Sequence, residues 1–356
     1  MLRRLIHPAL WSAMLACSLT LLLALYPEAA LSASIRGIAI WWEVLFPSLF
    51  TFFVLSEILL GFGVVHFFGT LLDPLMRPVF RIPGIGGFVM TMGFVAGYPV
   101  GARLTSQLRE QGLVNRSEGE RLVAFTTSSD PIFLVGAVSV GFFHNVAVAP
   151  LLAAAHYGSA MLVGILMRFH DRHVPATPAP ADQPDLRQTE TRRLQASLIA
   201  MHKARLADGR TFGTLLQDAI QSSLRLMFVV GGLVVFFSVM MEVLSQAGAI
   251  PRLAASIEAL MQLCGLPSVL SGAIVSGLFE VTLGAREAGM AGGALLHQLA
   301  IAAWVLSWGG LSVHAQIASL ISRTGMRYGP FLAARLLHSI LAVLLVYVLW
   351  GWLGPV

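Results

Sequence analysis

The sequence predicts an all-α membrane protein that crosses the bilayer several times. Of its 356 residues, 56% are hydrophobic and only 12% are charged. Soluble domains carry about 25% charged residues, so this composition indicates a membrane protein. Several apolar stretches reach the roughly 20 residues that a helix needs to cross the hydrocarbon core. A closed β-barrel would instead show short alternating strands, so we expect helices.

The first apolar stretch covers residues 10–26 and has features of a signal peptide. Arg3 and Arg4 precede it, and the Ala-rich residues 28–34 follow it. Many further spans come after it, so we favour an uncleaved first transmembrane helix. A second span is expected over residues 38–65, and an amphipathic stretch over 66–81 is expected to lie at the membrane interface.

Residues 83–143 contain two interrupted apolar segments. Residues 83–111 are apolar at first, are interrupted by Gly97, Tyr98 and Pro99, and end in the polar run RLTSQLREQ. We interpret this segment as a re-entrant helical hairpin that enters and leaves on one side of the membrane. Residues 121–143 are long enough to span the membrane, but the polar sequence SSDP at 128–131 breaks them. A plain span over 146–167 follows.

The rest of the chain repeats this order after a polar linker. Residues 168–210 form the linker, with prolines in its first half that predict disorder and a charged surface helix over 186–206. A span over 226–244 and an amphipathic stretch over 250–264 come next. A second interrupted segment covers 266–293, a span broken at SWGGLS covers 295–321, and the last span covers 331–352.

Positive charges support this topology. With a cytoplasmic N-terminus, about seven full spans and two hairpins, all but three of the 23 Lys and Arg residues fall on the cytoplasmic side. The exceptions are Arg36, Arg252 and Arg286. Such asymmetry is the positive-inside pattern, so we expect the N-terminus and the linker 168–210 to be cytoplasmic.

The two halves of the chain carry a matching motif. GFVAGYPVGAR at 93–103 resembles GLFEVTLGAR at 277–286, and each follows a proline at a hairpin entrance. In the topology above, the first hairpin enters from the cytoplasm and the second from outside, so the halves are inverted repeats. We expect four regions: an N-terminal transmembrane helix (1–37), a first repeat (38–167), the cytoplasmic linker (168–210) and a second repeat (211–356). Transporters with this architecture place the substrate site near the midplane of the membrane.

The hairpin tips and the two helix breaks contain the candidate binding residues. Non-helical backbone at membrane depth is tolerated only where protein or a water-filled cavity satisfies its polar groups. Glu280 and Asp130 are costly in an apolar run unless they are paired or hydrated, although Asp130 also suits a local cap of the break. The predicted substrate-binding residues are Gly97, Tyr98, Pro99, Gly101, Arg103, Ser128, Ser129, Asp130, Glu280, Thr282, Gly284, Arg286, Gly309, Gly310, Ser312, His314 and Gln316.

Several of these residues have structural alternatives. Arg103 and Arg286 suit carboxylate capture, but long side chains near helix ends also extend to the interface. His314 is expected either to respond to pH or to be a hydrogen-bonded structural histidine. Arg335 and His338 on the last span are interpreted as packing or interfacial residues, and Glu57 as solvated.

The sequence indicates neither an enzyme nor a metal protein. It contains no HExxH pair, no paired-aspartate signature and no GxSxG elbow. We expect no cofactor, although a coupling Na⁺ or H⁺ is left open. The expected partners are a small solute and the lipid bilayer but not nucleic acid, and a homo-oligomer is left open.

Five segments resemble the sporulation integral membrane protein YlbJ family. They are FPSLFTFFVLSE, PLMRPVFRIPGIGGFVMTMGFVAGYPVGAR, SEGERLVAFTTSSDPIFLVGAVSVGFF, GLFEVTLGAR and WGGLSVHAQIASL. The resemblance covers residues 46–335 apart from the linker. It implies a Gate, or nucleoside recognition, domain and an architecture similar to concentrative nucleoside transporters.

The resemblance also implies a role in endospore formation. The family is associated with movement of dipicolinate, a small aromatic dicarboxylate, across the outer forespore membrane. We therefore expect a secondary transporter of a small anionic metabolite, most specifically dipicolinate, in the bacterial cell membrane or the outer forespore membrane. Two alternatives stay open, a nucleoside-type transporter and a non-transporting scaffold or sensor in spore assembly.

Overall fold

The computed structural model describes residues 8–178, 190–263 and 265–355. All elements in these ranges are helical, which confirms the predicted fold class. Four helices are long and apolar enough to cross a membrane, namely 146–167, 212–246, 295–321 and 328–353. The number rises to six if two bent helix pairs each count as one span. About seven spans were expected, and the first broken helix, whose halves are both short, is not among these six.

The N-terminal region consists of two bent helix pairs. Helix α2 (Pro8–Leu25) meets α3 (Pro27–Ala39), and the pair bends by 102° next to Pro27. A π-helical turn, η1 (Ile40–Leu45), leads into α4 (Phe46–Gly61). A second bend of 93° separates α4 from α5 (Val64–Phe80), where Gly63 has a φ of 76° that only glycine adopts readily. Helix α5 corresponds to the predicted amphipathic stretch.

The first repeat contains the predicted hairpin and broken helix. Helices α6 (Gly86–Ala96) and α7 (Tyr98–Glu110) form the hairpin, and Gly97 separates them. Helix α8 (Arg116–Thr126) begins with a capping box formed by Asn115 and Glu118. The chain is then non-helical from Thr127 to Asp130, becomes helical again at Pro131 and continues as the π-helix η2 (Phe133–Phe142). A short turn, η3 (Val146–Val148), precedes α9 (Ala149–Met167).

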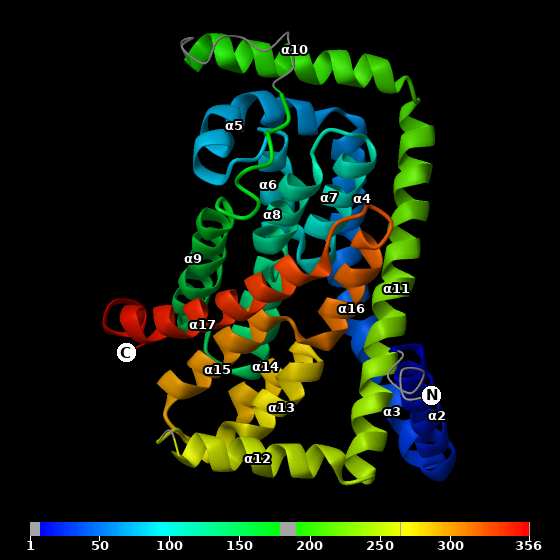
Figure 1. Cartoon of the computed structure of the whole chain (residues 1–356), viewed down its shortest axis with the longest axis vertical. Helices are drawn as coiled ribbons and strands as arrows, with labels where there is room; N and C mark the ends of the chain where they lie inside the picture. Colours follow the sequence, from blue (N-terminus) through cyan, green and yellow to red (C-terminus); the bar gives the residue numbers. More distant parts are fainter. Residues whose placement is uncertain (1–7, 179–189, 264, 356) are drawn as a thin grey trace.

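The linker and the next two helices border the molecule. Helix α10 (Glu190–Asp208) matches the predicted surface helix and lies across the top of Figure 1, packed on α5. The first part of the linker was predicted to be disordered, but residues 168–178 pack against α8: Asp171 accepts a hydrogen bond from Ser117, and the N–H of Thr177 donates one to Glu118. The rest of the predicted disordered part, residues 179–189, lies outside the described ranges. Helix α11 (Phe212–Gln246) then runs the length of the molecule to α12 (Ala249–Leu263) at the opposite end.

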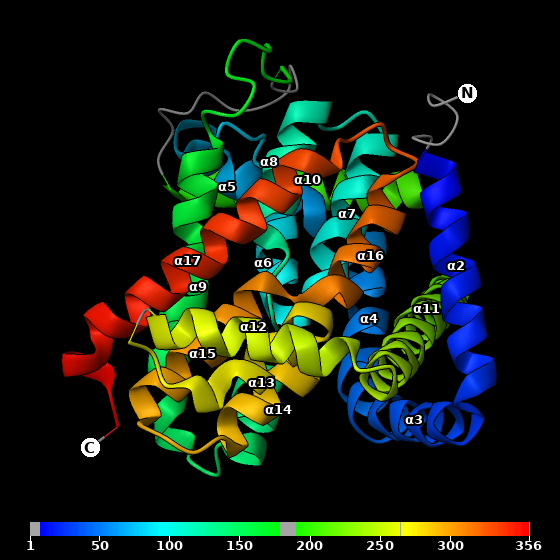
Figure 2. The same ribbon diagram turned by 60° about the horizontal axis from the view of Figure 1, so that its bottom comes forward.

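The second repeat has the same order of elements. A short turn, η4 (Ser268–Leu270), leads into the hairpin of α13 (Ser271–Phe279) and α14 (Val281–Met290). The second broken helix consists of α15 (Leu295–Trp308) and α16 (Gly310–Ile321), and α17 (Tyr328–Leu353) follows. Figures 1 and 2 show the α6–α7 hairpin near α5 and the α13–α14 hairpin near α12, so the hairpins lie toward opposite ends of the molecule.

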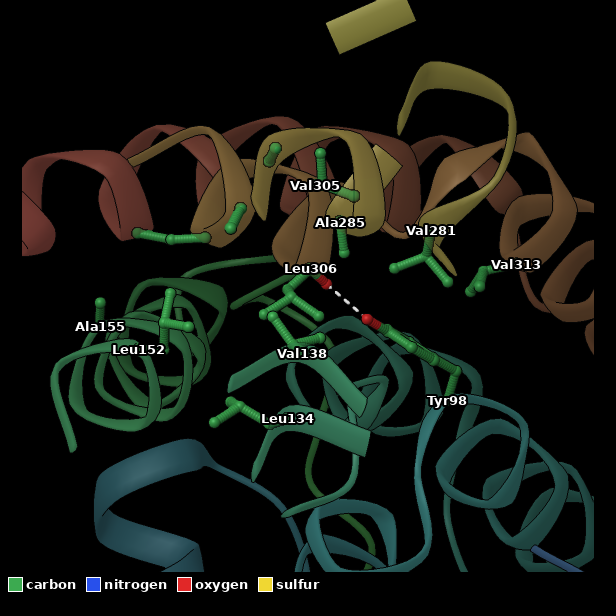
Figure 3. Close-up of a cluster of buried hydrophobic side chains, with 14 of the residues drawn as sticks. Tyr98, Leu134, Val138, Leu152, Ala155, Val281, Ala285, Val305, Leu306 and Val313 are labelled. Atoms are coloured by element: carbon green, nitrogen blue, oxygen red, sulfur yellow. Dashed lines mark hydrogen bonds between the residues drawn. The ribbon is translucent and has the colours of Figure 1, made fainter. Parts of the chain in front are cut away.

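The main hydrophobic core joins the two repeats. Its buried side chains come from α7, the first broken helix and α9 in the first repeat, and mainly from α13, α14, α15, α16 and α17 in the second. Figure 3 shows Leu134 and Val138 of η2 packed near Leu306 of α15. Burial of this apolar surface holds the two helix breaks close together, which positions the candidate site.

Candidate functional site

Both hairpin tips and the broken helices meet at one small cavity. Its volume is about 60 Å³. The lining residues come from the first hairpin tip, the first break, the second hairpin tip, α16, α11 and η1: Leu45, Ala96, Gly97, Tyr98, Pro99, Asp130, Phe133, Val230, Val234, Glu280, Val281, Thr282, Ser312, Val313 and Gln316. The fold therefore brings together residues that lie more than 200 positions apart in the sequence.

About half of the predicted binding residues line this cavity. Those that do are Gly97, Tyr98, Pro99, Asp130, Glu280, Thr282, Ser312 and Gln316. The others, which do not line it, are Gly101, Arg103, Ser128, Ser129, Gly284, Arg286, Gly309, Gly310 and His314.

The first hairpin tip is built from backbone and one tyrosine. Gly97 has a φ of 89°, and a Cβ added to it would lie 3.2 Å from Oδ2 of Asp130. The buried Tyr98 donates a hydrogen bond from its hydroxyl to the carbonyl of Leu306, at 2.7 Å (Figure 3). Because Leu306 belongs to α15, this bond connects the first hairpin tip to the broken helix of the other repeat.

Asp130 caps the helix that follows the first break. Its Oδ1 accepts a hydrogen bond of 2.8 Å from the backbone N–H of Phe133, and its side chain is almost completely buried. This contact satisfies one of the free N–H groups at the start of η2. The local capping role that the sequence allowed for Asp130 is therefore present.

Glu280 has the same kind of role at the second hairpin tip. Its Oε2 accepts a hydrogen bond of 2.8 Å from the N–H of Leu283, and its Oε1 accepts one of 3.2 Å from the Thr282 hydroxyl. Glu280 is thus the N-cap of α14, with a backbone φ of −145°. Both buried carboxylates in the cavity therefore lie at helix N-termini, where the helix dipole favours negative charge.

The second break provides polar side chains with free hydrogen-bonding capacity. Gly309 and Gly310 have φ values of 86° and 70°, and a Cβ on Gly310 would lie 2.9 Å from the backbone nitrogen of Glu280. The two glycines thus let α16 begin next to the second hairpin tip. Ser312 and Gln316, one turn apart on α16, have no hydrogen-bond partner among the described residues and line the cavity. They are free to bind a solute or water there.

Gly101 and Gly284 have packing roles. Gly101 lies within α7, where a Cβ would come 2.6 Å from the carbonyl oxygen of Thr126 on α8. Gly101, which was predicted to be a binding residue at the hairpin tip, therefore lies inside α7, and the chain turns at Gly97. Gly284 packs directly against Gly277 across the second hairpin. Both glycines let helix backbones approach closely, as in small-residue packing between membrane helices.

The two motif arginines lie in different surroundings. Arg103 forms an ion pair with Glu57 and a hydrogen bond with Ser222. Glu57 was expected to be solvated, but only 17% of its side chain is exposed because α7 and α4 bring it against Arg103. Arg286 lines a separate cavity of about 440 Å³ together with Arg36. It has no ion pair among the described residues.

Ser128 and Ser129 belong to a polar network behind the cavity. The N–H of Ser129 donates to Nε2 of His156 at 3.0 Å, and the Ser128 hydroxyl lies 2.9 Å from the same nitrogen. Because Nε2 accepts, the ring proton is on Nδ1, which donates to the Ser307 hydroxyl at 3.0 Å. His156 therefore joins the first break to the second, a role that the sequence analysis missed.

His314 is a structural histidine in this arrangement. Its Nδ1 lies 2.6 Å from the hydroxyl of Tyr328, and its Nε2 lies 3.2 Å from the carbonyl oxygen of Trp308. Because a carbonyl only accepts, Nε2 donates and Nδ1 accepts from Tyr328. Both ring nitrogens are thus occupied, so His314 has none left for a solute.

Arg335 and His338 of α17 complete the network. Arg335 is fully buried and donates to the carbonyls of Thr127, at 2.6 Å, Ser307, at 3.3 Å, and Ala124. His338 donates from Nε2 to the carbonyl of His156 at 2.9 Å. The sequence signal was present, since Arg and His inside an apolar span are costly, but their partners lie on other helices.

One group of side chains has metal-ligand geometry in the described part of the chain. It consists of Glu120, His170 and Asp171, away from the cavity. Arg327 forms ion pairs with both carboxylates of this group, and Glu120 also contacts His170 at 2.7 Å. Arg116 also forms an ion pair with Glu120, so Arg116 and Arg327 together balance the two carboxylates. This cluster is therefore better described as an ion-pair network that joins α8, the start of the linker and the loop before α17.

Comparison with known proteins places these features in a family. The Gate family model, described as nucleoside recognition, matches residues 42–201 and 227–327. The sporulation integral membrane protein YlbJ of Bacillus subtilis (strain 168) is 42% identical over 328 residues, covering 91% of this chain and 78% of that protein. An uncharacterized protein of Alkalihalophilus pseudofirmus is 31% identical over 109 residues, or 28% of this chain and 24% of that protein.

A solved structure was also found to align with the chain. The structure of CNTnw in an inward-facing substrate-bound state covers 96% of this chain and 87% of that chain, with 12% identity and a TM-score of 0.48. The family model and the YlbJ match together establish the relationship. The chain belongs to the Gate, or nucleoside recognition, family and within it to the YlbJ family of sporulation integral membrane proteins.

Proposed function

We propose that this protein is a secondary transporter of a small anionic metabolite in spore formation, and that the metabolite is dipicolinate. The carrying observation is the single cavity at which both hairpin tips and α16 meet the first break. Solute sites of inverted-repeat transporters lie where such half-helix ends converge. Membership in the YlbJ family supports the sporulation role.

Two helix N-termini favour an anion in this cavity. Tyr98 and Pro99 begin α7, and Ser312 lies in the first turn of α16; neither helix has a side-chain cap among the described residues. The N-terminus of α14 is already capped by the Glu280 carboxylate. Each uncapped N-terminus carries a partial positive charge of about half an elementary charge. A carboxylate of the solute would be stabilised by these two N-termini.

Asp130 and Glu280 make protons the favoured coupling ion in this proposal. Both carboxylates lie in the cavity, so a dicarboxylate solute would bring four negative charges together if all groups were ionised. Like charges at such short range in a site of low dielectric constant repel by several kcal/mol. Protonation of Asp130 and Glu280 removes this repulsion. We therefore propose that protons accompany the anion and that uptake is faster at acidic pH.

The volume of the cavity implies movement of the hairpins. A cavity of about 60 Å³ holds a few water molecules, whereas an aromatic dicarboxylate needs more space. The tips at Gly97 and Glu280 are the elements that can separate to admit it. We propose that alternating access consists of opening the two hairpins in turn, in the outer forespore membrane or the cell membrane. The N-terminus and linker would face the cytoplasm, in accord with the distribution of positive charge.

The test is uptake of labelled dipicolinate by liposomes that contain the purified protein. We expect concentration-dependent uptake above that of empty liposomes, with inhibition by unlabelled dipicolinate and none by uridine. The Glu280→Gln variant should lose most of the activity, and Glu258→Gln, which changes an exposed glutamate on α12, should keep it. Uptake of uridine instead would favour a nucleoside-type transporter. Absence of uptake of either solute would contradict the transport proposal.

A further inference from the structure

The two broken helices end with carbonyl groups inside the protein. Helix α8 ends at Thr126 and α15 ends at Trp308, and both ends lie behind the cavity. The last carbonyls of a helix lack intrahelical partners, and the C-terminal end carries about half of a negative elementary charge. Two such ends close together therefore present about one negative charge, which must be compensated within an apolar environment.

Arg335 provides the compensating charge. Its guanidinium group donates to the Thr127 and Ala124 carbonyls at the end of α8 and to the Ser307 carbonyl at the end of α15. No side-chain carboxylate of the described residues forms an ion pair with it. One face of the group lies 5.5 Å from the centre of the Phe331 ring. The positive charge of Arg335 is thus matched by two helix ends instead of by an acidic side chain.

The histidine between the two breaks, His156, is neutral. His156 accepts from the N–H of Ser129 through Nε2 and donates to Ser307 through Nδ1, a pattern that only the uncharged imidazole allows. The hydroxyls of Ser128 and Ser307 complete its surroundings. The charge that faces the two helix ends is consequently that of Arg335.

Unwound carbonyls and half-helix C-termini are the groups that coordinate Na⁺ in transporters with broken helices. We infer that Arg335 is a fixed internal cation that occupies the position of such a Na⁺ at both breaks. No mobile alkali cation then binds at the carbonyl ends of α8 and α15. Arg335 is then a positioning residue, since it holds both breaks in register while the hairpin tips contact the solute. The inference deepens the proposed transport function. Only its uptake measurement depends on that function, and its unfolding measurements do not.

Thermal unfolding of the purified protein in detergent tests this inference without any solute. The wild-type midpoint should be the same within about 1 °C in 100 mM NaCl and in 100 mM choline chloride, because the carbonyl ends are already occupied. Arg335→Ala should lower the midpoint by roughly 5–10 °C. Millimolar guanidinium should restore part of this loss, because it replaces the missing group. Arg252→Ala, at an exposed arginine on α12, should change nothing.

Two further measurements keep the inference testable if Arg335→Ala fails to fold. Arg335→Lys retains the charge and should remain indifferent to Na⁺. Uptake by the wild-type protein in liposomes should be equal in Na⁺ and in choline. Stabilisation of the wild-type protein by Na⁺ of several degrees, or an Arg335→Ala variant as stable as wild type, would overturn the inference. If no dipicolinate uptake occurs at all, the proposed function fails while the unfolding measurements still decide the role of Arg335.

Discussion

The two hairpin tips have the same architecture and different chemistry. The first tip turns at Gly97, which has a φ of 89°, and Tyr98 fixes it to α15 through one hydrogen bond. The second tip turns at Glu280, whose side chain caps α14. The repeats therefore share a fold but contribute unequally to the cavity: the second tip provides an ionisable side chain, and the first provides backbone and an aromatic hydroxyl.

The two helix breaks differ in a complementary way. The first break has the polar sequence SSDP, and His156, Arg335 and the Asp130 cap satisfy its backbone. The second break has two glycines with positive φ, and it leaves Ser312 and Gln316 free to bind a solute. In each repeat one element carries a carboxylate and the other does not. We conclude that the symmetry lies in the backbone and that the side chains lining the cavity are asymmetric.

The largest expected effect distinguishes the two carboxylates. Glu280→Gln should lower proton-driven dipicolinate uptake by at least about tenfold, or about 1.4 kcal/mol, because glutamine cannot carry the coupling proton. It should also flatten the dependence of uptake on pH. Asp130→Asn should have a smaller effect, since Asn caps a helix as well as Asp does. Uptake measured between pH 5 and pH 8 checks both variants. Equal activity of Glu280→Gln and wild type would show that the second tip has no special role.

The next prediction compares the two motif arginines. Arg103→Ala leaves Glu57 without its ion-pair partner in a mostly buried position, so the free energy of unfolding should fall by roughly 2–3 kcal/mol. Arg286→Ala, at an exposed position, should change it by less than about 0.5 kcal/mol. Denaturation monitored by circular dichroism gives both values. Similar losses of unfolding free energy in the two variants would contradict the difference between the surroundings of the two arginines.

The glycine of the first tip should also be sensitive. Gly97→Ala places a side chain at a φ of 89° and brings its Cβ 3.2 Å from Asp130, which should cost about 1–2 kcal/mol of stability and reduce uptake. Gly136→Ala is the matched control, because a Cβ there has no neighbour within 4 Å. The thermal midpoint and the uptake rate of both variants provide the check. A harmless Gly97→Ala would mean that the tip does not require glycine.

The smallest expected effect concerns the ion-pair network around Arg327. Burial alone would raise the pKa of Asp171, but hydrogen bonds from Ser117 and Arg327 outweigh it and hold the pKa below its usual value. A carboxyl with a lowered pKa stabilises the fold fully at neutral pH, and this stabilisation is lost as the pH falls below about 4. Arg327→Gln should cost only about 1 kcal/mol at pH 7, because Arg327 is half exposed. In addition, Glu120 keeps Arg116 and His170 as partners, and Asp171 keeps His170. The difference from wild type should shrink toward pH 3. Unfolding midpoints measured from pH 7 to pH 3 test whether the difference in stability shrinks as predicted.

Much of the fold was predictable because the chain marks its interruptions with distinctive residues. Three interruptions stand out in apolar segments: Gly97 with Pro99, the SSDP sequence, and Gly309 with Gly310. The hairpins and breaks were therefore predicted correctly. The network of His156 and Arg335 was not, because each is a single polar residue in an apolar span and its partners come from distant helices. The Arg103–Glu57 pair was missed for the same reason.

The most direct test of a shared site is protection of introduced thiols by the solute. Thr282→Cys on the second tip and Gln316→Cys on α16 would be introduced singly after Cys17 and Cys264 are changed to alanine. We predict that dipicolinate slows the labelling of both cysteines by a membrane-permeant maleimide, whereas Met290→Cys, exposed at the end of α14, labels at an unchanged rate. If saturating dipicolinate leaves the labelling of Thr282→Cys and Gln316→Cys unchanged, the result contradicts the proposal that the hairpin tips and breaks form the dipicolinate-binding site.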